Sequence, residues 1–304
     1  MTGTPAVEPT PAAGQPSALG DPARTQIMGV LNVTPDSFSD GGRYFDHAKA
    51  IAHGLALTTA GADIIDVGGE STRPGAVRVD EDEELRRVVP VVRELAAAGV
   101  LISVDTMRAA VASAAIDAGA HIINDVSAGL SDPGMLTVAA DTGVPIVLMH
   151  WRGHLDRADA TFHYDDVLAE VVAELRERID AAVAAGIDPD AIIVDPGLGF
   201  SKNADHNWQI LAGLDAFSAF DQRLLVAASR KRFISSLVSP EDPTRAAEAA
   251  KDQATAVISA FAAQAGAWAV RVHDPAASAL ACRVAAAIAD HAAPGTSPWK
   301  PGRA

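Results

Sequence analysis

The 304-residue chain lacks most features of secreted, membrane or nucleic-acid-binding proteins. It has one cysteine, Cys282, which excludes an internal disulfide framework and suits a reducing compartment such as the cytoplasm. No apolar run approaches the roughly 20 residues that a membrane-spanning helix needs. Acidic residues outnumber basic ones by 39 to 24, and the formal net charge of −15 disfavours nucleic acids and anionic membranes as partners. A local basic pocket can still bind a small anion.

The two ends of the chain lack a periodic apolar pattern. Residues 1–24 are rich in Pro, Ala, Gly and Thr and have neither the basic start nor the apolar core of a signal peptide. We therefore expect a disordered N-terminal tail. Residues 291–304 contain three prolines and are expected to form a second tail. Residues 25–290 are then expected to form a single domain.

Between the tails, short apolar runs alternate with helical patterns. The runs are 27–31, 63–67, 100–104, 121–123, 145–149, 191–194, 223–228 and 268–272, and the helical patterns are 46–60, 80–98, 107–118, 132–142, 165–186, 204–212, 246–265 and 275–289. Eight such β/α units indicate an α/β protein with a TIM (β/α)8 barrel, a fold of about 250 residues. The alternative is an open, doubly wound sheet. It would need a glycine-rich phosphate loop, and no such motif follows the first run.

Local signals support several of the expected helices. Asp105-Thr106 precedes one helix and Asp132-Pro133 another, as capping residues do. Gly143 follows one of the helices just before the next apolar run, where a C-terminal glycine is expected.

Polar residues follow nearly every apolar run, and a closed barrel would bring them to one mouth. Burying so many polar groups is unfavourable unless they bind something, although any single one can instead cap a helix. Asp105, Asn124 and Asp195 supply carboxylates and an amide, which match the flat donor–acceptor edge of a guanidine-like heterocycle.

Lys231, Arg271 and His273 are expected to form a cationic side of the same mouth. They follow the last two runs, where TIM barrels often bind phosphate. Asn32 offers one oxygen ligand for Mg²⁺, which needs only one or two protein ligands besides phosphates and water. The alternative roles are a turn-stabilising amide for Asn32 and a helix cap for His273. A zinc site is not expected, because the chain has no HExxH motif and no paired cysteines.

Two loops, 34–42 and 70–76, are rich in Gly, Ser and Pro, a composition that permits unusual backbone angles. They are either surface connections or a pair of lids that close over the mouth and exclude water. Phe38 in the first loop and Arg73 in the second favour lids.

With these residues in view, the chain resembles the bacterial-type dihydropteroate synthases. The matching strings are NVTPDSFSDGG from Asn32, DVGGESTRPGA from Asp66, SVDT from Ser103, IIND from Ile122, LMH from Leu148, DPGLGF from Asp195, SRKRF from Ser229 and RVHD from Arg271. The resemblance implies a TIM barrel that joins p-aminobenzoate to 6-hydroxymethyl-7,8-dihydropterin pyrophosphate in folate biosynthesis. It also implies SN1-like loss of pyrophosphate under mobile loops, assistance from Mg²⁺ as cofactor and a homodimer. The family is a sulfonamide target, and sulfonamide-like analogues are expected to bind poorly without pyrophosphate.

The resemblance also assigns roles. Around the pterin, Asp105, Asn124 and Asp195 would hold the edge of the ring, Lys231 and Arg271 would flank it, and Met149 and Phe200 would pack around it. At the pyrophosphate, Asn32 would bind Mg²⁺, and the contacts would be Thr72, Arg271 and His273. The aminobenzoate site would be completed by Phe38, Asp40, Arg73 and Pro74. The expected catalytic residues are Asp40, Arg73, Asp105, Lys231 and Arg271. One departure is Ala227, where relatives often have Gly, which puts the pterin affinity in doubt.

Three other functions remain as alternatives. Corrinoid methyltransferases share the Asp/Asn set but not the two loop strings. A non-catalytic paralogue could bind pterins or partners. A Schiff-base aldolase could use Lys231, whose pKa would be depressed between Arg230 and Arg232.

Overall fold

The structure is a computed structural model that describes residues 19, 24–34, 47–70, 79–153 and 163–292. Most of the two predicted tails, residues 1–18, 20–23 and 293–304, lies outside the described residues. Two residues of the predicted N-terminal tail contact the barrel. The Leu19 carbonyl accepts a hydrogen bond from Trp268 Nε1 at 2.8 Å, and Arg24 forms two hydrogen bonds with the Asp63 carboxylate.

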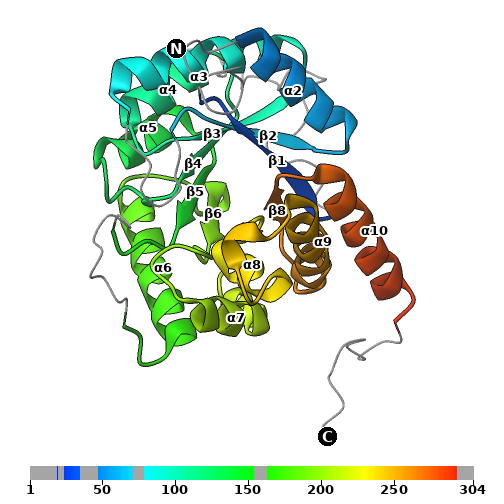
Figure 1. The fold of residues 1–304 in the computed structure, drawn as a ribbon. Helices are drawn as coiled ribbons and strands as arrows, with labels where there is room; N and C mark the ends of the chain where they lie inside the picture. The colour runs from blue at the N-terminus through cyan, green and yellow to red at the C-terminus, as the bar shows by residue number, and fades with distance from the viewer. Residues whose placement is uncertain (1–18, 20–23, 35–46, 71–78, 154–162, 293–304) are drawn as a thin grey trace, which may run out of the picture.

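Eight parallel strands form a closed barrel in the order of the chain, which confirms the predicted TIM barrel and excludes the open sheet. The strands are β1 Gln26–Asn32, β2 Ile64–Gly68, β3 Leu101–Asp105, β4 Ile122–Asp125, β5 Ile146–Met149, β6 Ile192–Asp195, β7 Arg223–Val226 and β8 Ala269–Val272. Figure 1 shows the helices arranged around this ring of strands. Each predicted run overlaps one strand, because short runs of Val, Ile and Leu fit strands that are buried on both faces.

The helices surround the barrel. They are α2 His47–Thr59, α3 Glu81–Ala97, α4 Ala109–Asp117, α5 Gly134–Thr142, α6 Val167–Ala184, α7 Ala204–Ala212, α8 Arg232–Val238, α9 Glu248–Gln264 and α10 Pro275–Asp290, with short 3₁₀ helices at Pro189–Ala191, Leu214–Ala219 and Pro243–Arg245. In the part of the chain that the structure describes, no helix has the length and apolar character needed to cross a membrane.

Two sequence-based expectations need correction. Helix α8 was not predicted, because its seven residues are too few to show a clear period, although Phe233 and Ile234 are buried. The predicted cap of α4 by Asp105-Thr106 is wrong. The helix begins at Ala109, and the Ala109 amide donates to Asp132 Oδ2 at 2.8 Å. Asp105 instead pairs with Arg271, and Thr106 Oγ1 donates to Glu84 and accepts from the Arg108 amide.

The inside of the barrel changes character along its axis. Near the N-terminal ends of the strands, inward side chains form an apolar cluster of Met28, Ile64, Leu101, Ile122, Val147, Ile193, Leu225, Trp268 and Ala269. Near the C-terminal ends, buried Asp66, Ser103, Asp105, Asn124 and Asp195 take their place. Because side chains alternate along a strand, the intervening residues pack outward against the helices. The fold thus places its buried polar groups at one mouth.

Candidate active site

An arginine joins the acids at the barrel mouth. Arg271 on β8 donates from Nε to Asp66 Oδ2 at 2.5 Å and from an Nη to Asp105 Oδ2 at 2.7 Å. Asn124 on β4 donates from Nδ2 to the same Asp66 oxygen at 3.0 Å. Asp105 and Asn124 are register partners on adjacent strands. Four side chains from four strands therefore form one hydrogen-bonded group.

This arrangement revises the predicted separation into an acidic and a cationic side. Arg271 lies among the carboxylates rather than opposite them. Burial lowers the pKa of Arg271, but Asp66 and Asp105 outweigh that effect and the net pKa is raised. The pKa of Asp105 is raised to about 7 overall. Burial is the largest cause and the acids Asp66 and Glu84 add to it, whereas Arg271 opposes it. Arg271 thus stays cationic, while Asp105 titrates near neutral pH.

Lys231, in the loop after β7, lies beside Phe200 at the same mouth. Its Nζ lies 4.0 Å from the centre of the Phe200 ring, a cation–π geometry. Its aliphatic stem passes over Gly199, where an added Cβ would lie 2.7 Å from Lys231 Cδ. The pKa of Lys231 is lowered to about 8 overall. Burial and then Arg271 lower it, and Asp195 and Asp105 oppose this. The charge of Lys231 therefore also changes near neutral pH.

Asp195 and Met149 end neighbouring strands and are register partners. Asp195 is buried, and its Oδ1 accepts from the Gly197 amide at 2.7 Å. Burial raises the pKa of Asp195, whereas the Gly197 hydrogen bond and Lys231 lower it. Met149 is buried beside it, and Ala227 is buried just after β7. The predicted pterin-contacting residues of β5 and β6 are thus adjacent.

The residues after β7 and β8 have different partners. His273 Nδ1 lies 2.9 Å from Ser229 Oγ. Arg230 turns away from Lys231 and forms two 2.8 Å hydrogen bonds with Asp252 on α9. The reason offered for a depressed Lys231 pKa is therefore wrong: burial and Arg271 cause it, not Arg230 and Arg232.

Asn32, the last residue of β1, is partly buried and is the register partner of Gly68. Its side chain makes no hydrogen bond to the part of the chain that the structure describes. The described residues hold no cluster of three or more His, Cys, Asp or Glu suited to a metal ion. One amide oxygen fits a cation that takes most of its ligands from substrate phosphates and water.

The loop residues Phe38, Asp40, Thr72, Arg73 and Pro74 lie outside the described residues. Their predicted roles stay predictions from the sequence.

Asp66 is the functional residue that sequence reasoning did not select. The signal was an isolated carboxylate within an apolar strand, because such a group needs a buried partner. Asp66 has none of its side chain exposed, and it orients both Arg271 and Asn124.

Comparisons with known proteins agree with this geometry. The model of the family described as "Pterin binding enzyme" matches residues 28–273. The dihydropteroate synthase of Mycobacterium leprae is 53% identical over 266 residues, covering 87% of this chain and 94% of that protein, and the Escherichia coli K12 enzyme is 46% identical over 265 residues, covering 87% and 92%.

Solved structures are similar as well. Dihydropteroate synthase of Xanthomonas albilineans with 4-aminobenzoic acid is 45% identical with a TM-score of 0.80, covering 90% of this chain and 96% of that one. The same enzyme in complex with 7,8-dihydropteroate is 44% identical with a TM-score of 0.77, covering 88% and 95%. The family model spans most of the chain, and the relatives match along nearly their whole length. The chain therefore belongs to the pterin binding enzymes, among the dihydropteroate synthases.

Proposed function

We propose that the protein condenses 6-hydroxymethyl-7,8-dihydropterin pyrophosphate with p-aminobenzoate, giving 7,8-dihydropteroate and pyrophosphate in folate biosynthesis. The supporting observation is the group of buried strand-end side chains, Asp105, Asn124 and Asp195, at one barrel mouth. A relative has been solved with 4-aminobenzoic acid and also with 7,8-dihydropteroate, which supports one proposed substrate and the proposed product.

The pterin ring would lie with its edge toward the acids and one face toward Lys231 and Phe200. A dihydropterin presents a flat edge of N–H donors, which pairs with carboxylate and amide oxygens. Asp195 and Asn124 have such oxygens, and their positions are fixed by Gly197 and Asp66. Met149 would pack on the ring, because it is buried at the end of the neighbouring strand.

The chemistry breaks the bond between the methylene carbon and the pyrophosphate oxygen, and the electron pair leaves with pyrophosphate. The methylene becomes cationic and is conjugated with the pterin, and the ionised Asp105 carboxylate stabilises this charge. The amine of p-aminobenzoate then attacks the methylene and releases its proton to water. No covalent enzyme intermediate or strong general base is needed.

Arg271 would help to hold the departing pyrophosphate. Its guanidinium has five N–H donors, of which two are directed at Asp66 and Asp105. The remaining donors are available to phosphate oxygens. His273 is proposed as a further contact, with its ring oriented by Ser229.

Mg²⁺ is proposed as the cofactor, with Asn32 as its protein ligand. When bound, the ion would neutralise charge on the leaving pyrophosphate. The Asn32 amide would hold the pyrophosphate end of the substrate at β1, away from the pterin edge on β4 and β6. We expect Asn32→Ala to raise the Mg²⁺ concentration needed for half-maximal rate, while Asn32→Asp should largely preserve it.

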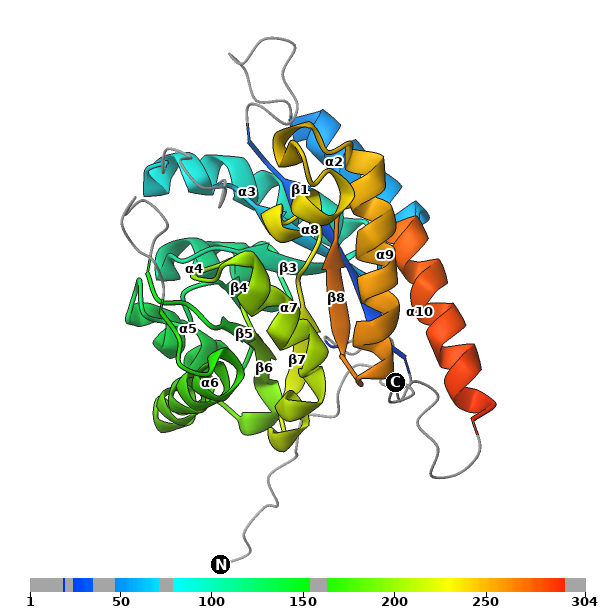
Figure 2. The ribbon, with the colours of Figure 1, turned by 60° about the horizontal axis from the view of Figure 1, so that its bottom comes forward.

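A homodimer is proposed through helices α9 and α10, which lie side by side in Figure 2. Their outer faces expose Val257 and Phe261 on α9, and Leu280 and Val284 on α10, each more than half exposed. The four-residue spacing places each pair on one helix face, and an apolar face of this kind suits a second copy of the chain. Val257→Glu with Val284→Glu should give a monomer by light scattering, whereas Leu55→Glu on α2 should not.

The protein is proposed to work in the cytoplasm. The free, buried Cys282 is compatible with a reducing compartment.

The activity is tested by incubating the purified protein with both substrates and Mg²⁺ and measuring dihydropteroate and pyrophosphate by mass spectrometry. We expect the two products in equal amounts, and none when either substrate is omitted. A folded protein that binds pterin but forms no dihydropteroate would contradict the proposal.

A further inference from the structure

Lys202 lies behind the site, at the end of the turn that follows β6. Its Nζ is within hydrogen-bond distance of three acceptors: His150 Nδ1 at 2.8 Å, the Gly197 carbonyl at 3.1 Å and the Phe200 carbonyl at 3.1 Å. When Lys202 is protonated, its ammonium group has three donors, and each has an acceptor. The pKa of Lys202 is lowered to about 7, chiefly by burial and also by Arg152, while Asp195 and Glu174 oppose this.

The turn from Asp195 to Ser201 has an unusual backbone. Gly197, Gly199 and Ser201 all have positive φ, at 69°, 76° and 51°. Carbonyl groups that are buried in such a turn need donors. Lys202 supplies a donor to two of them. A methyl group at Gly197 would lie 2.2 Å from the His150 carbonyl oxygen, so the turn packs directly against the end of β5.

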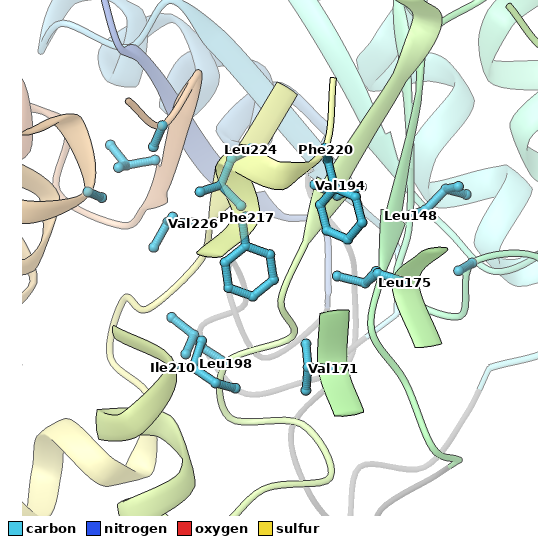
Figure 3. Close-up of a cluster of buried hydrophobic side chains, with 14 of the residues drawn as sticks. Leu148, Val171, Leu175, Val194, Leu198, Ile210, Phe217, Phe220, Leu224 and Val226 are labelled. Atoms are coloured by element: carbon cyan, nitrogen blue, oxygen red, sulfur yellow. The ribbon is translucent and has the colours of Figure 1, made fainter. Parts of the chain in front are cut away.

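One side of the turn is anchored in the apolar core. Leu198 is 1% exposed, and Figure 3 shows it beside Ile210 among the buried side chains of the cluster. Asp195 and Phe200 lie on either side of Leu198 and are the two residues of this turn that are proposed to contact the pterin. Leu198 fixes the middle of the turn, and the contacts of Lys202 fix its end.

His150, which follows β5, connects Lys202 to helix α6. The pKa of His150 is lowered to about 3 overall, by burial and then by Lys202, with Glu174 opposing. The ring is therefore neutral. Its Nδ1 accepts from Lys202, which leaves the proton on Nε2, 2.9 Å from Glu174 Oε2. The imidazole therefore links the lysine to an acid on α6.

A second set of contacts connects Glu174 back to the turn. Arg152 pairs with Glu174, and its backbone amide donates to Ser201 Oγ at 3.2 Å. The Arg152 guanidinium stacks 3.9 Å from the centre of the Tyr164 ring, and the Tyr164 hydroxyl donates to the Ser201 carbonyl at 3.0 Å. The turn is thus enclosed by a continuous ring of polar contacts.

We propose that Lys202 and His150 are positioning residues that set the Asp195 carboxylate and the Phe200 ring for pterin binding, without touching the pterin themselves. This inference rests on the proposed function, because it assumes that Asp195 and Phe200 contact the pterin. Lys202 holds the Phe200 carbonyl directly, and His150 holds Lys202. The Asp195 carbonyl accepts from the backbone amide of His150 at 2.8 Å, so the backbone that carries this side chain also lies beside the start of the turn.

The test measures pterin binding by calorimetry, and KM for each substrate, in Lys202→Met. Lys251→Met on α9 is the matched control, because Lys251 is partly buried and its ion pair is with Glu248 on its own helix. We expect Lys202→Met to weaken pterin binding by about tenfold or more, since small misplacement of a binding group has effects of this order. KM for p-aminobenzoate should stay within about twofold of wild type, since the turn faces the pterin. Lys251→Met should match wild type.

A second pair of variants separates positioning from general destabilisation. His150→Asn keeps an acceptor near the Nδ1 position and should retain most of the pterin affinity, whereas His150→Leu removes it and should behave as Lys202→Met. Equal affinities in these two variants, or unchanged pterin binding in a folded Lys202→Met, would overturn the inference. If wild type itself neither binds pterin nor forms dihydropteroate, the proposed function fails instead.

Discussion

Arg271 Nε lies 2.5 Å from Asp66 Oδ2, so a carboxylate within β2 orients an arginine within β8. The same oxygen accepts from Asn124, and the other oxygen, Oδ1, has no partner among the described residues. Asp66 is therefore the acceptor on which two proposed substrate-binding side chains depend. Its effect on the reaction is indirect, through their orientation.

Asp66→Asn should lower both stability and activity. The change removes a buried charge that faces Arg271, and we expect a loss of about 1.5–3 kcal/mol in the free energy of unfolding, the range for a hydrogen bond to a charged group. Urea denaturation measures it. Ser103→Ala is the matched control, because Ser103 is the register partner of Asp66 and its buried Oγ has no partner among the described residues. A loss as large in Ser103→Ala would contradict this role of Asp66.

Asp195→Asn should weaken pterin binding. The amide keeps the shape of the side chain and an oxygen for the Gly197 amide, but removes the charged acceptor. We expect a loss of about 1.5–3 kcal/mol in binding free energy, or roughly 10- to 150-fold in Kd. Titration calorimetry with a pterin measures this directly, and an unchanged Kd would show that Asp195 does not contact the ring.

Gly199→Ala should disturb Lys231. Gly199 has a φ of 76°, and the new methyl group would lie 2.7 Å from Lys231 Cδ. Gly143→Ala is a matched control with a φ of 66° and nothing within 4 Å of its added Cβ. Both variants should lose about 1–2 kcal/mol of stability from backbone strain. Only Gly199→Ala should also lose pterin affinity, and equal affinities in the two variants would contradict the proposed contact.

The dependence of kcat/KM on pH should be bell-shaped. The pKa of Asp105 is raised to about 7, so its stabilising charge is lost as the pH falls below that value. The pKa of Lys231 is lowered to about 8, so its ammonium is lost as the pH rises above that value. The maximum should therefore lie between the two. Lys231→Arg keeps a cation at all these pH values and should abolish the alkaline fall, and an alkaline fall that persists in this variant would show that another group causes it.

The sequence predicted the barrel because each strand is a short apolar run that ends in polar residues. It also predicted that Asp105 and Asp195 would meet at one mouth, since all strands of a parallel barrel end on the same side. It did not predict which side chains pair. Arg271 was placed opposite the acids, yet it lies between Asp66 and Asp105. The strand register pairs Arg271 with Met28 on β1, and its side chain reaches from there to the acids of β2 and β3.

The role of Lys202 was also hidden in the sequence. The lysine follows the DPGLGF string and reads as a surface residue after a loop. Only the left-handed backbone at Gly197, Gly199 and Ser201 turns its ammonium group back toward the carbonyls of the same loop. Contacts of this kind depend on backbone angles that residue type alone does not determine.

The central claim is that the C-terminal mouth of this barrel binds a pterin through its strand-end acids. A crystal structure of the protein with 6-hydroxymethylpterin tests it most directly. The account predicts the ring between Phe200 and Met149, with oxygens of Asp105, Asn124 and Asp195 within hydrogen-bond distance of its nitrogens. A pterin bound elsewhere on the protein, or at the mouth without contact to these three side chains, would contradict it.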